Sequence, residues 1–200
     1  MPGSKGPSWL TFLGHTTDSL WNMDLFRTES ILLKSHWVLV VMDQFSRRII
    51  GFAVQPRDID GHSLCGMFNQ IIAGTGLPRR LSFDNAPLFD FAQWKTNLQI
   101  LEIDPIRSVL NVPVSHPFIE RLIGTVSREF LDHLFYWNSA DLFRKLDSFK
   151  TYYNGIRVHQ GIQGDIPDHE ARDEKSPAVS LHDFAWESHC NGLFQMPMAA

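Results

Sequence analysis

The sequence predicts an α/β domain with a mixed five-stranded sheet flanked by helices. Three observations lead to this fold class: strand-like segments come first, helices and strands then alternate, and two helical segments follow. The chain has 200 residues, of which 44% are hydrophobic and 20% are charged. A chain of this length and composition can bury one sizeable core.

Three short apolar segments predict the first strands, at residues 20–26, 36–43 and 48–55. They are rich in β-branched and aromatic side chains, which favour extended backbone. A polar turn at residues 44–47 separates the second strand from the third. We therefore expect the three strands to form an antiparallel meander.

Helical periodicity replaces the strand pattern at residues 61–73. The turn-forming residues Gly74, Gly76 and Pro78 follow and are expected to end this helix. Its apolar positions are spaced so that they share one helix face: Leu64, Met67, Phe68, Ile71 and Ile72.

The middle of the chain alternates between strand and helix. We expect a strand at residues 80–83, a helix at 89–98 and a fifth strand at 99–103. Strands that alternate with helices in this way are typical of a sheet with parallel neighbours. The fourth strand can therefore lie beside the first.

Two helices are predicted to complete the domain. The first begins at Pro117, since proline suits the first helical turn, after a proline-containing loop at residues 111–117. The second covers residues 139–153 with Ser139 as its N-cap. The polar chain from Ile166 onward shows no period, and we expect it to be irregular.

These elements predict three regions: an N-terminal linker at 1–17, the core at 18–165 and a C-terminal tail at 166–200. Cys65 and Cys190 are the two cysteines and belong to no metal-binding or disulfide pattern, so a reducing compartment is expected. No apolar run is long enough for a membrane span, and the N-terminus does not resemble a signal peptide. The net charge of −4 disfavours a protein that coats nucleic acid through bulk charge.

Three acidic residues stand at unusual places in this pattern. Asp24 interrupts the apolar first strand, Asp84 follows the fourth strand, and Glu120 lies near the start of the helix after the proline loop. Ligands of open α/β sheets bind at the carboxyl ends of strands, where these acids could meet. Clustered carboxylates repel one another, and a Mg²⁺ or Mn²⁺ ion would remove that conflict. The residues alone leave an alternative open, with a turn at Asp84 and a dipole-favoured charge at Glu120.

Five motifs accompany these acids in order. The set resembles the catalytic cores of retroviral-type integrases and bacterial insertion-sequence transposases, the DDE superfamily with a ribonuclease H-like fold. The 35 residues between Asp84 and Glu120 match the superfamily's spacing, and the resemblance covers about residues 20–167. The motifs are WNMDLF with Asp24, VMDQFSRRIIGF, LSFDNAPLF with Asp84, HPFIERLIGTVSREFLD with Glu120, and YYNGIRVHQGI.

The resemblance implies a metal-dependent polynucleotidyl transferase that nicks DNA and transfers strands in integration or transposition. It assigns Asp24, Asp84 and Glu120 to catalysis and to holding two Mg²⁺ (or Mn²⁺) ions, whose charge would bring the formal total from −4 to 0. The implied partners are DNA, at element ends and target, and further copies of the chain in a dimer or larger assembly, without a membrane. The implied location is the bacterial cytoplasm, associated with the nucleoid.

Contacts to DNA are expected at Asn85 and on the helix that carries Glu120, at Arg121, Ser127 and Arg128. Retroviral relatives often have a basic residue where this chain has Gly124, so basic contacts from this helix must come from its two arginines. The family often has glycine where this chain has Ala86, which fits the turn if its φ stays negative.

Other roles remain open at this point. Asp43 is expected to cap a turn, and Arg157 and His159 either contact phosphate or pack against the preceding helix. Residues 1–20 are too few for the helix-turn-helix with which transposases find element ends. Two alternatives therefore stand beside the enzyme: a catalytically inactive or truncated core that binds DNA or self-associates, and a ribonuclease H-like nuclease.

Overall fold

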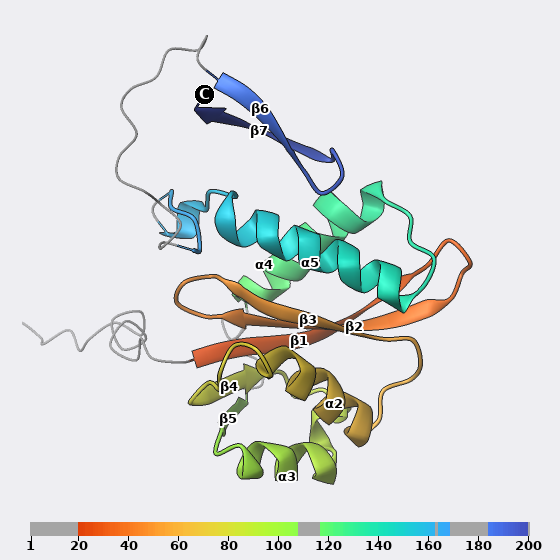
Figure 1. Ribbon diagram of the computed structural model, residues 1–200. Coiled ribbons are helices and arrows are strands. Elements are labelled where there is room, and N and C mark those ends of the chain that lie inside the picture. Colours follow the sequence, from red (N-terminus) through yellow and green to blue (C-terminus); the bar gives the residue numbers. More distant parts are fainter. Residues whose placement is uncertain (1–19, 108–116, 163, 169–183, 200) are drawn as a thin grey trace, which may run out of the picture.

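A mixed sheet forms the centre of the computed structural model, which describes residues 20–107, 117–162, 164–168 and 184–199 (Figure 1). Its strand order is β3-β2-β1-β4-β5. The first three strands are antiparallel, whereas β4 runs parallel to β1 and β5 runs parallel to β4. The predicted meander and the pairing of the first strand with the fourth are confirmed. The bounds are β1 Leu20–Glu29, β2 Ser35–Asp43, β3 Ile49–Gln55, β4 Arg80–Phe83 and β5 Asp104–Arg107.

Helices cover both faces of this sheet (Figure 1). On one face lie α2 (Gly61–Ile72) and α3 (Ala92–Ile100), and on the other lie α4 (Pro117–Thr125) and α5 (Ser139–Gly155). Side chains of a strand alternate between faces, so β1 contributes to both layers. Trp21 and Met23 join the core under α2, while Phe26 packs against the core under α5.

The first helix forms as its pattern predicts. The side chain of Asp60 accepts a hydrogen bond from the Ser63 backbone N–H at 2.7 Å and caps α2. Every one of the five periodic apolar residues is buried. Burial of one stripe against the sheet explains why this segment is helical.

The predicted fifth strand at residues 99–103 is wrong, because α3 continues to Ile100 and β5 begins at Asp104. Trp94 and Leu98 lie four residues apart and are buried, so the helical stripe reaches the predicted end at residue 98, and the helix continues for two residues beyond it. Glu102 has a positive φ of 56° in the turn that follows. The chain reverses there, and the strand starts after it.

The start of α5 also differs from the prediction. Asn138, not Ser139, is the N-cap: its side chain accepts from the Asp141 N–H at 3.0 Å. The carbonyl of Asn138 accepts the first helical bond from Leu142 at 2.9 Å, so Ser139 already lies inside the helix. Asparagine caps as well as serine does, and the sequence offered both in succession.

The helix from Pro117 forms, but its geometry changes along its length. After α4, residues Val126–Phe130 form a π-helical segment (η2) and Leu131–His133 a 3₁₀ turn (η3). The buried side chains Ile119, Leu122, Val126 and Phe130 keep the chain against the sheet through this change. Residues 108–116, which include most of the predicted loop, lie outside the described residues.

The tail is not irregular throughout, because β6 (Phe184–His189) and β7 (Phe194–Ala199) form an antiparallel hairpin. The hairpin lies over α5 (Figure 1). The ring of Phe194 stacks on that of Tyr152, with centroids 4.4 Å apart. A packed aromatic pair of this kind has no local sequence period, which explains the missed strands. The predicted linker at 1–17 lies outside the described residues.

No helix in the described ranges has the length and apolar character needed to cross a membrane.

Candidate functional site

The sheet register places Asp24 and Asp84 at the same level. Asn22 on β1 pairs with Ser82 on the parallel strand β4. Asp24 lies two residues after Asn22, and Asp84 lies two residues after Ser82. Both acids therefore lie on one face of the sheet, just past the end of β4. Trp21, Met23 and Leu81 occupy the opposite face, within the core under α2.

The helix α4 brings the third acid to this face. Glu120 is exposed in the first turn of α4, which packs against β1. The pKa of Asp24 is raised to about 6, chiefly because the carboxyl is buried. The negative charges of Asp84 and Glu120 raise it further, while a hydrogen bond from the Leu25 N–H opposes the change. Asp24 therefore lies close enough to both Asp84 and Glu120 to be repelled by their charges.

The side chains of the three acids do not form a complete set of metal ligands in this structure. Among the described residues, no three His, Cys, Asp or Glu side chains are grouped so that they could hold one ion. An oxygen of Asp24 accepts from the Leu25 N–H at 2.7 Å, and one of Asp84 accepts from the Ala86 N–H at 3.0 Å. A carboxylate has two oxygens, so neither hydrogen bond uses up the side chain. Carboxylates that repel one another are a donor set suited to Mg²⁺ or Mn²⁺.

The raised pKa predicts how metal-free stability depends on pH. The carboxyl of Asp24 binds its proton more tightly in the folded chain than in the unfolded one. The resulting stabilisation is complete below about pH 4 and is lost as the pH rises through about 6. In EDTA, we expect the free energy of unfolding to fall by on the order of 2 kcal/mol across this interval. Urea unfolding measures it.

The matched variant for that measurement is Asp24→Asn, which cannot titrate. Its free energy of unfolding should change less with pH over the same interval, because the contribution of this one carboxyl is removed. Identical pH profiles for the wild type and the variant would contradict the assignment of this titration to Asp24.

The turn after β4 accommodates alanine as expected. Ala86 has a φ of −61°, so no glycine is required. Its N–H donates to Asp84, which fixes the backbone beside that carboxylate. Asn85 is half-buried in the same turn. Its contact with DNA stays a prediction.

The predicted DNA-contact residues of the long helix point in different directions. Successive residues of a helix are about 100° apart, so Ser127 lies on the side of Glu120 and Arg121 lies about a quarter-turn away. Ser127 is half-buried, and the exposed Arg128 donates from Nε to the Gly124 carbonyl at 3.2 Å. Arg121 lines a cavity on another side of α4. DNA contacts at these three residues stay predictions.

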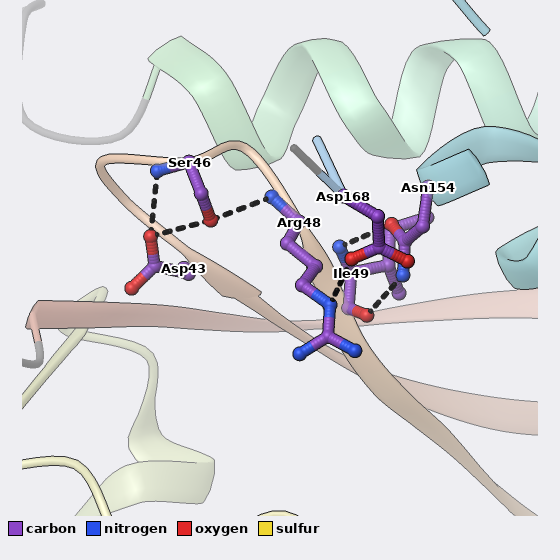
Figure 2. Close-up of polar contacts among 6 residues, drawn as sticks. All are labelled: Asp43, Ser46, Arg48, Ile49, Asn154 and Asp168. Carbon is purple, nitrogen blue, oxygen red and sulfur yellow. Dashed lines mark hydrogen bonds and ion pairs between the residues drawn. The ribbon is translucent and has the colours of Figure 1, made fainter. Parts of the chain in front are cut away.

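Asp43 stabilises the β2–β3 turn, as expected. One of its oxygens accepts from the backbone N–H groups of Phe45 and Ser46 at 3.0 and 2.7 Å, and from the Ser46 hydroxyl at 2.8 Å. Figure 2 shows Asp43 and Ser46 closing this turn. The next residue, Arg47, has a positive φ of 65°.

Asn154 joins the end of α5 to β3 (Figure 2). Its Oδ1 accepts from the Ile49 N–H and its Nδ2 donates to the Ile49 carbonyl, both at 2.9 Å. Nearby, Arg48 forms an ion pair with Asp168. These bonds give Asn154, in the last turn of α5, a structural role: it fixes the helix end on the sheet.

Sequence analysis did not identify one feature of this region, a cavity of about 390 Å³ beside α4. Arg47, Arg121 and Arg157 line it from three separate segments. Arg157 forms an ion pair with Glu129 of η2, and its guanidinium lies 6.0 Å from the centre of the Tyr153 ring on α5, which agrees with packing against the preceding helix, one of the two expected alternatives. Residues so far apart in sequence give no local signal, although the Arg47-Arg48 pair is visible.

Comparison with solved structures identifies the fold. The human T-lymphotropic virus core, described as the "HTLV-2 integrase catalytic core domain in complex with magnesium (dimeric form)", superposes with a TM-score of 0.59 and 16% identity, covering 76% of this chain and 93% of that one. A chain of the structure described as "simian T-cell lymphotropic virus intasome in complex with PP2A regulatory subunit B56 gamma" superposes with a TM-score of 0.60 and 17% identity, covering 90% of this chain and 67% of that one. The catalytic core domain of BIV integrase superposes with a TM-score of 0.54 and 18% identity, covering 75% of this chain and 91% of that one. The chain therefore has the ribonuclease H-like fold of integrase cores.

Comparison of sequences does not assign the chain to a family. No family model matches the chain. One curated protein, the JmjC domain-containing histone demethylation protein 1 of Aspergillus fumigatus, is 33% identical over 102 residues, which is 50% of this chain. The chain spans only 7% of that protein's length, so the activity in its name does not transfer to this chain.

Proposed function

We propose that this chain is a catalytic core that cuts and transfers DNA strands with the help of a divalent metal. The observation that supports this most is that Asp24 and Asp84 lie at one level of an integrase-like sheet, where the charges of Asp84 and Glu120 both act on Asp24. Asp24 and Asp84 would hold the metal from β1 and the end of β4, and Glu120 would complete the set from α4. Bound Mg²⁺ or Mn²⁺ would supply activation of the attacking oxygen and stabilisation of the leaving oxygen.

The chain's own residues prepare this site. Backbone N–H groups of Leu25 and Ala86 hold one oxygen each of Asp24 and Asp84, which limits the rotation of both carboxylates. The sheet fixes the level of the two aspartates, while Glu120 is exposed in the first turn of α4. A nucleophilic side chain is not required, because water or a 3′-hydroxyl attacks the phosphodiester.

We propose DNA and further copies of this chain as partners. The neighbouring structures are described as dimeric and trimeric integrase cores and as an intasome, which supports assembly on DNA. The magnesium named for the HTLV-2 core supports the choice of metal. Membership of the bacterial insertion-sequence group, and a place at the nucleoid, stay predictions from the sequence motifs.

The test is a cutting assay on labelled duplex DNA, pre-nicked DNA and an RNA–DNA hybrid. We expect product from the DNA substrates with Mg²⁺ or Mn²⁺ and none with EDTA. Cutting of the hybrid alone would identify a ribonuclease H-like nuclease instead. Absence of product from every substrate, together with no rise in melting temperature in Mn²⁺, would favour a non-catalytic module that binds DNA or self-associates.

A further inference from the structure

The cavity beside α4 is lined by residues from three segments of the chain. The β2–β3 turn contributes Arg47, α4 contributes Arg121 and Thr125, and the end of α5 contributes Tyr153 and Arg157. Its volume is about 390 Å³, which lies in the range of small-molecule sites. None of the three carboxylates Asp24, Asp84 and Glu120 is among its lining residues.

The cavity is positively charged. Three guanidinium groups and the imidazole of His159 line it, and no described lining residue is an Asp or a Glu. Two acids whose charges act on lining residues are already engaged: Glu129 forms an ion pair with Arg157, and Asp43 accepts hydrogen bonds from the turn. The described part of the chain therefore leaves two of the three positive charges, Arg47 and Arg121, without an ion pair.

Arg47 is held in place but lacks hydrogen-bond acceptors. Its guanidinium lies 3.2 Å from the centre of the Phe118 ring, so its position is fixed by stacking. Its Nε and Nη1 atoms are buried and have no hydrogen-bond partner among the described residues. The pKa of Arg47 is lowered to about 10, chiefly by burial and in part by the charge of Arg121. Buried donors of this kind are costly unless a ligand accepts from them.

His159 provides a second unsatisfied group among the lining residues. Its Nε2 is buried without a partner in the described part of the chain, and its ring packs on Tyr153 with centroids 4.4 Å apart. Two of the residues that line the cavity, Arg47 and His159, thus each carry a buried nitrogen without a partner among the described residues.

We propose that this cavity binds a phosphate group, held by Arg47, Arg121 and Arg157. Arginine forks match the oxygens of phosphate, and a dianion would balance the two unpaired positive charges. The volume leaves room for a sugar attached to the phosphate. The phosphate could belong to a DNA backbone or to a small phosphorylated molecule. The proposal does not depend on the cutting activity, because it concerns different side chains and needs no metal.

The test is an NMR titration of the ¹⁵N-labelled full chain in EDTA, with inorganic phosphate as the probe. We expect saturable shifts of arginine Nε–H signals. Arg121→Ala should weaken phosphate binding about tenfold, because one charged hydrogen-bond donor is lost. Arg144→Ala is the matched control: it removes the same charge from a side chain that is 77% exposed on α5, and should change binding less than twofold.

Two further arms distinguish the source of the phosphate. A DNA backbone predicts that a short duplex displaces inorganic phosphate and that Arg121→Ala weakens duplex binding. A small molecule predicts that a nucleoside monophosphate displaces phosphate and that duplex binding is the same in both variants. Absence of saturable phosphate binding by the wild type, or equal binding by Arg121→Ala and Arg144→Ala, overturns the proposal. Either result can occur whether or not the chain cuts DNA.

Discussion

Replacing Asp24 with asparagine is expected to lower the rate of metal-dependent DNA cutting by at least about a thousandfold. Asparagine has nearly the same shape and can still accept from the Leu25 N–H, so β1 should keep its structure. The variant loses the negative charge that the proposed metal site requires. Initial rates of strand cutting, measured with Mg²⁺ and again with Mn²⁺, give the comparison.

The control is Asp58→Asn, which makes the same chemical change at an exposed position between β3 and α2. Its cutting rate should stay within about twofold of the wild type, because surface substitutions away from special features have small effects. If Asp24→Asn cuts as fast as Asp58→Asn, Asp24 has no part in the chemistry. Asp84→Asn and Glu120→Gln are expected to behave as Asp24→Asn does.

The second large effect is expected on stability, at Asn154. Replacing it with alanine should lower the free energy of unfolding by about 2–4 kcal/mol. Its side chain is buried and satisfies both the N–H and the carbonyl of Ile49, where β3 begins. Alanine would leave both backbone groups without that partner and would release the end of α5 from the sheet. Urea unfolding at constant pH measures the loss.

Asn69→Ala is the matched control for Asn154. Asn69 is exposed on α2 and bonds with the side chain of Asn97 at the surface. The free energy of unfolding of the Asn69→Ala variant should differ from that of the wild type by no more than about 0.5 kcal/mol. Equal losses for Asn69→Ala and Asn154→Ala would show that the link from Asn154 to Ile49 does not stabilise the fold.

The sequence predicts most of the layer that positions the proposed site. The meander and α2 follow from short-range patterns, namely β-branched runs and one apolar stripe. Asp24 and Asp84 stand out because each breaks or ends an apolar strand. Their closeness could be predicted because parallel pairing of β1 with β4 brings equivalent positions to one level.

The features that were missed depend on contacts between distant residues. The hairpin β6–β7 is placed by packing such as Phe194 on Tyr152, which leaves no periodic signature. The start of β5 depends on a turn at Glu102, whose positive φ is not a preference of glutamate. The cavity beside α4 needs three arginines that only the folded chain brings together.

We propose that Asp24, Asp84 and Glu120 together form one divalent metal site. Calorimetric titration of Mn²⁺ into the metal-free wild type, Asp84→Asn and Asp58→Asn tests it most directly, since it needs neither DNA nor turnover. We expect saturable binding by the wild type and by Asp58→Asn, and binding at least about tenfold weaker by Asp84→Asn, because a charged ligand is lost. Equal Mn²⁺ affinity in all three proteins, or no Mn²⁺ binding by the wild type, would contradict the claim.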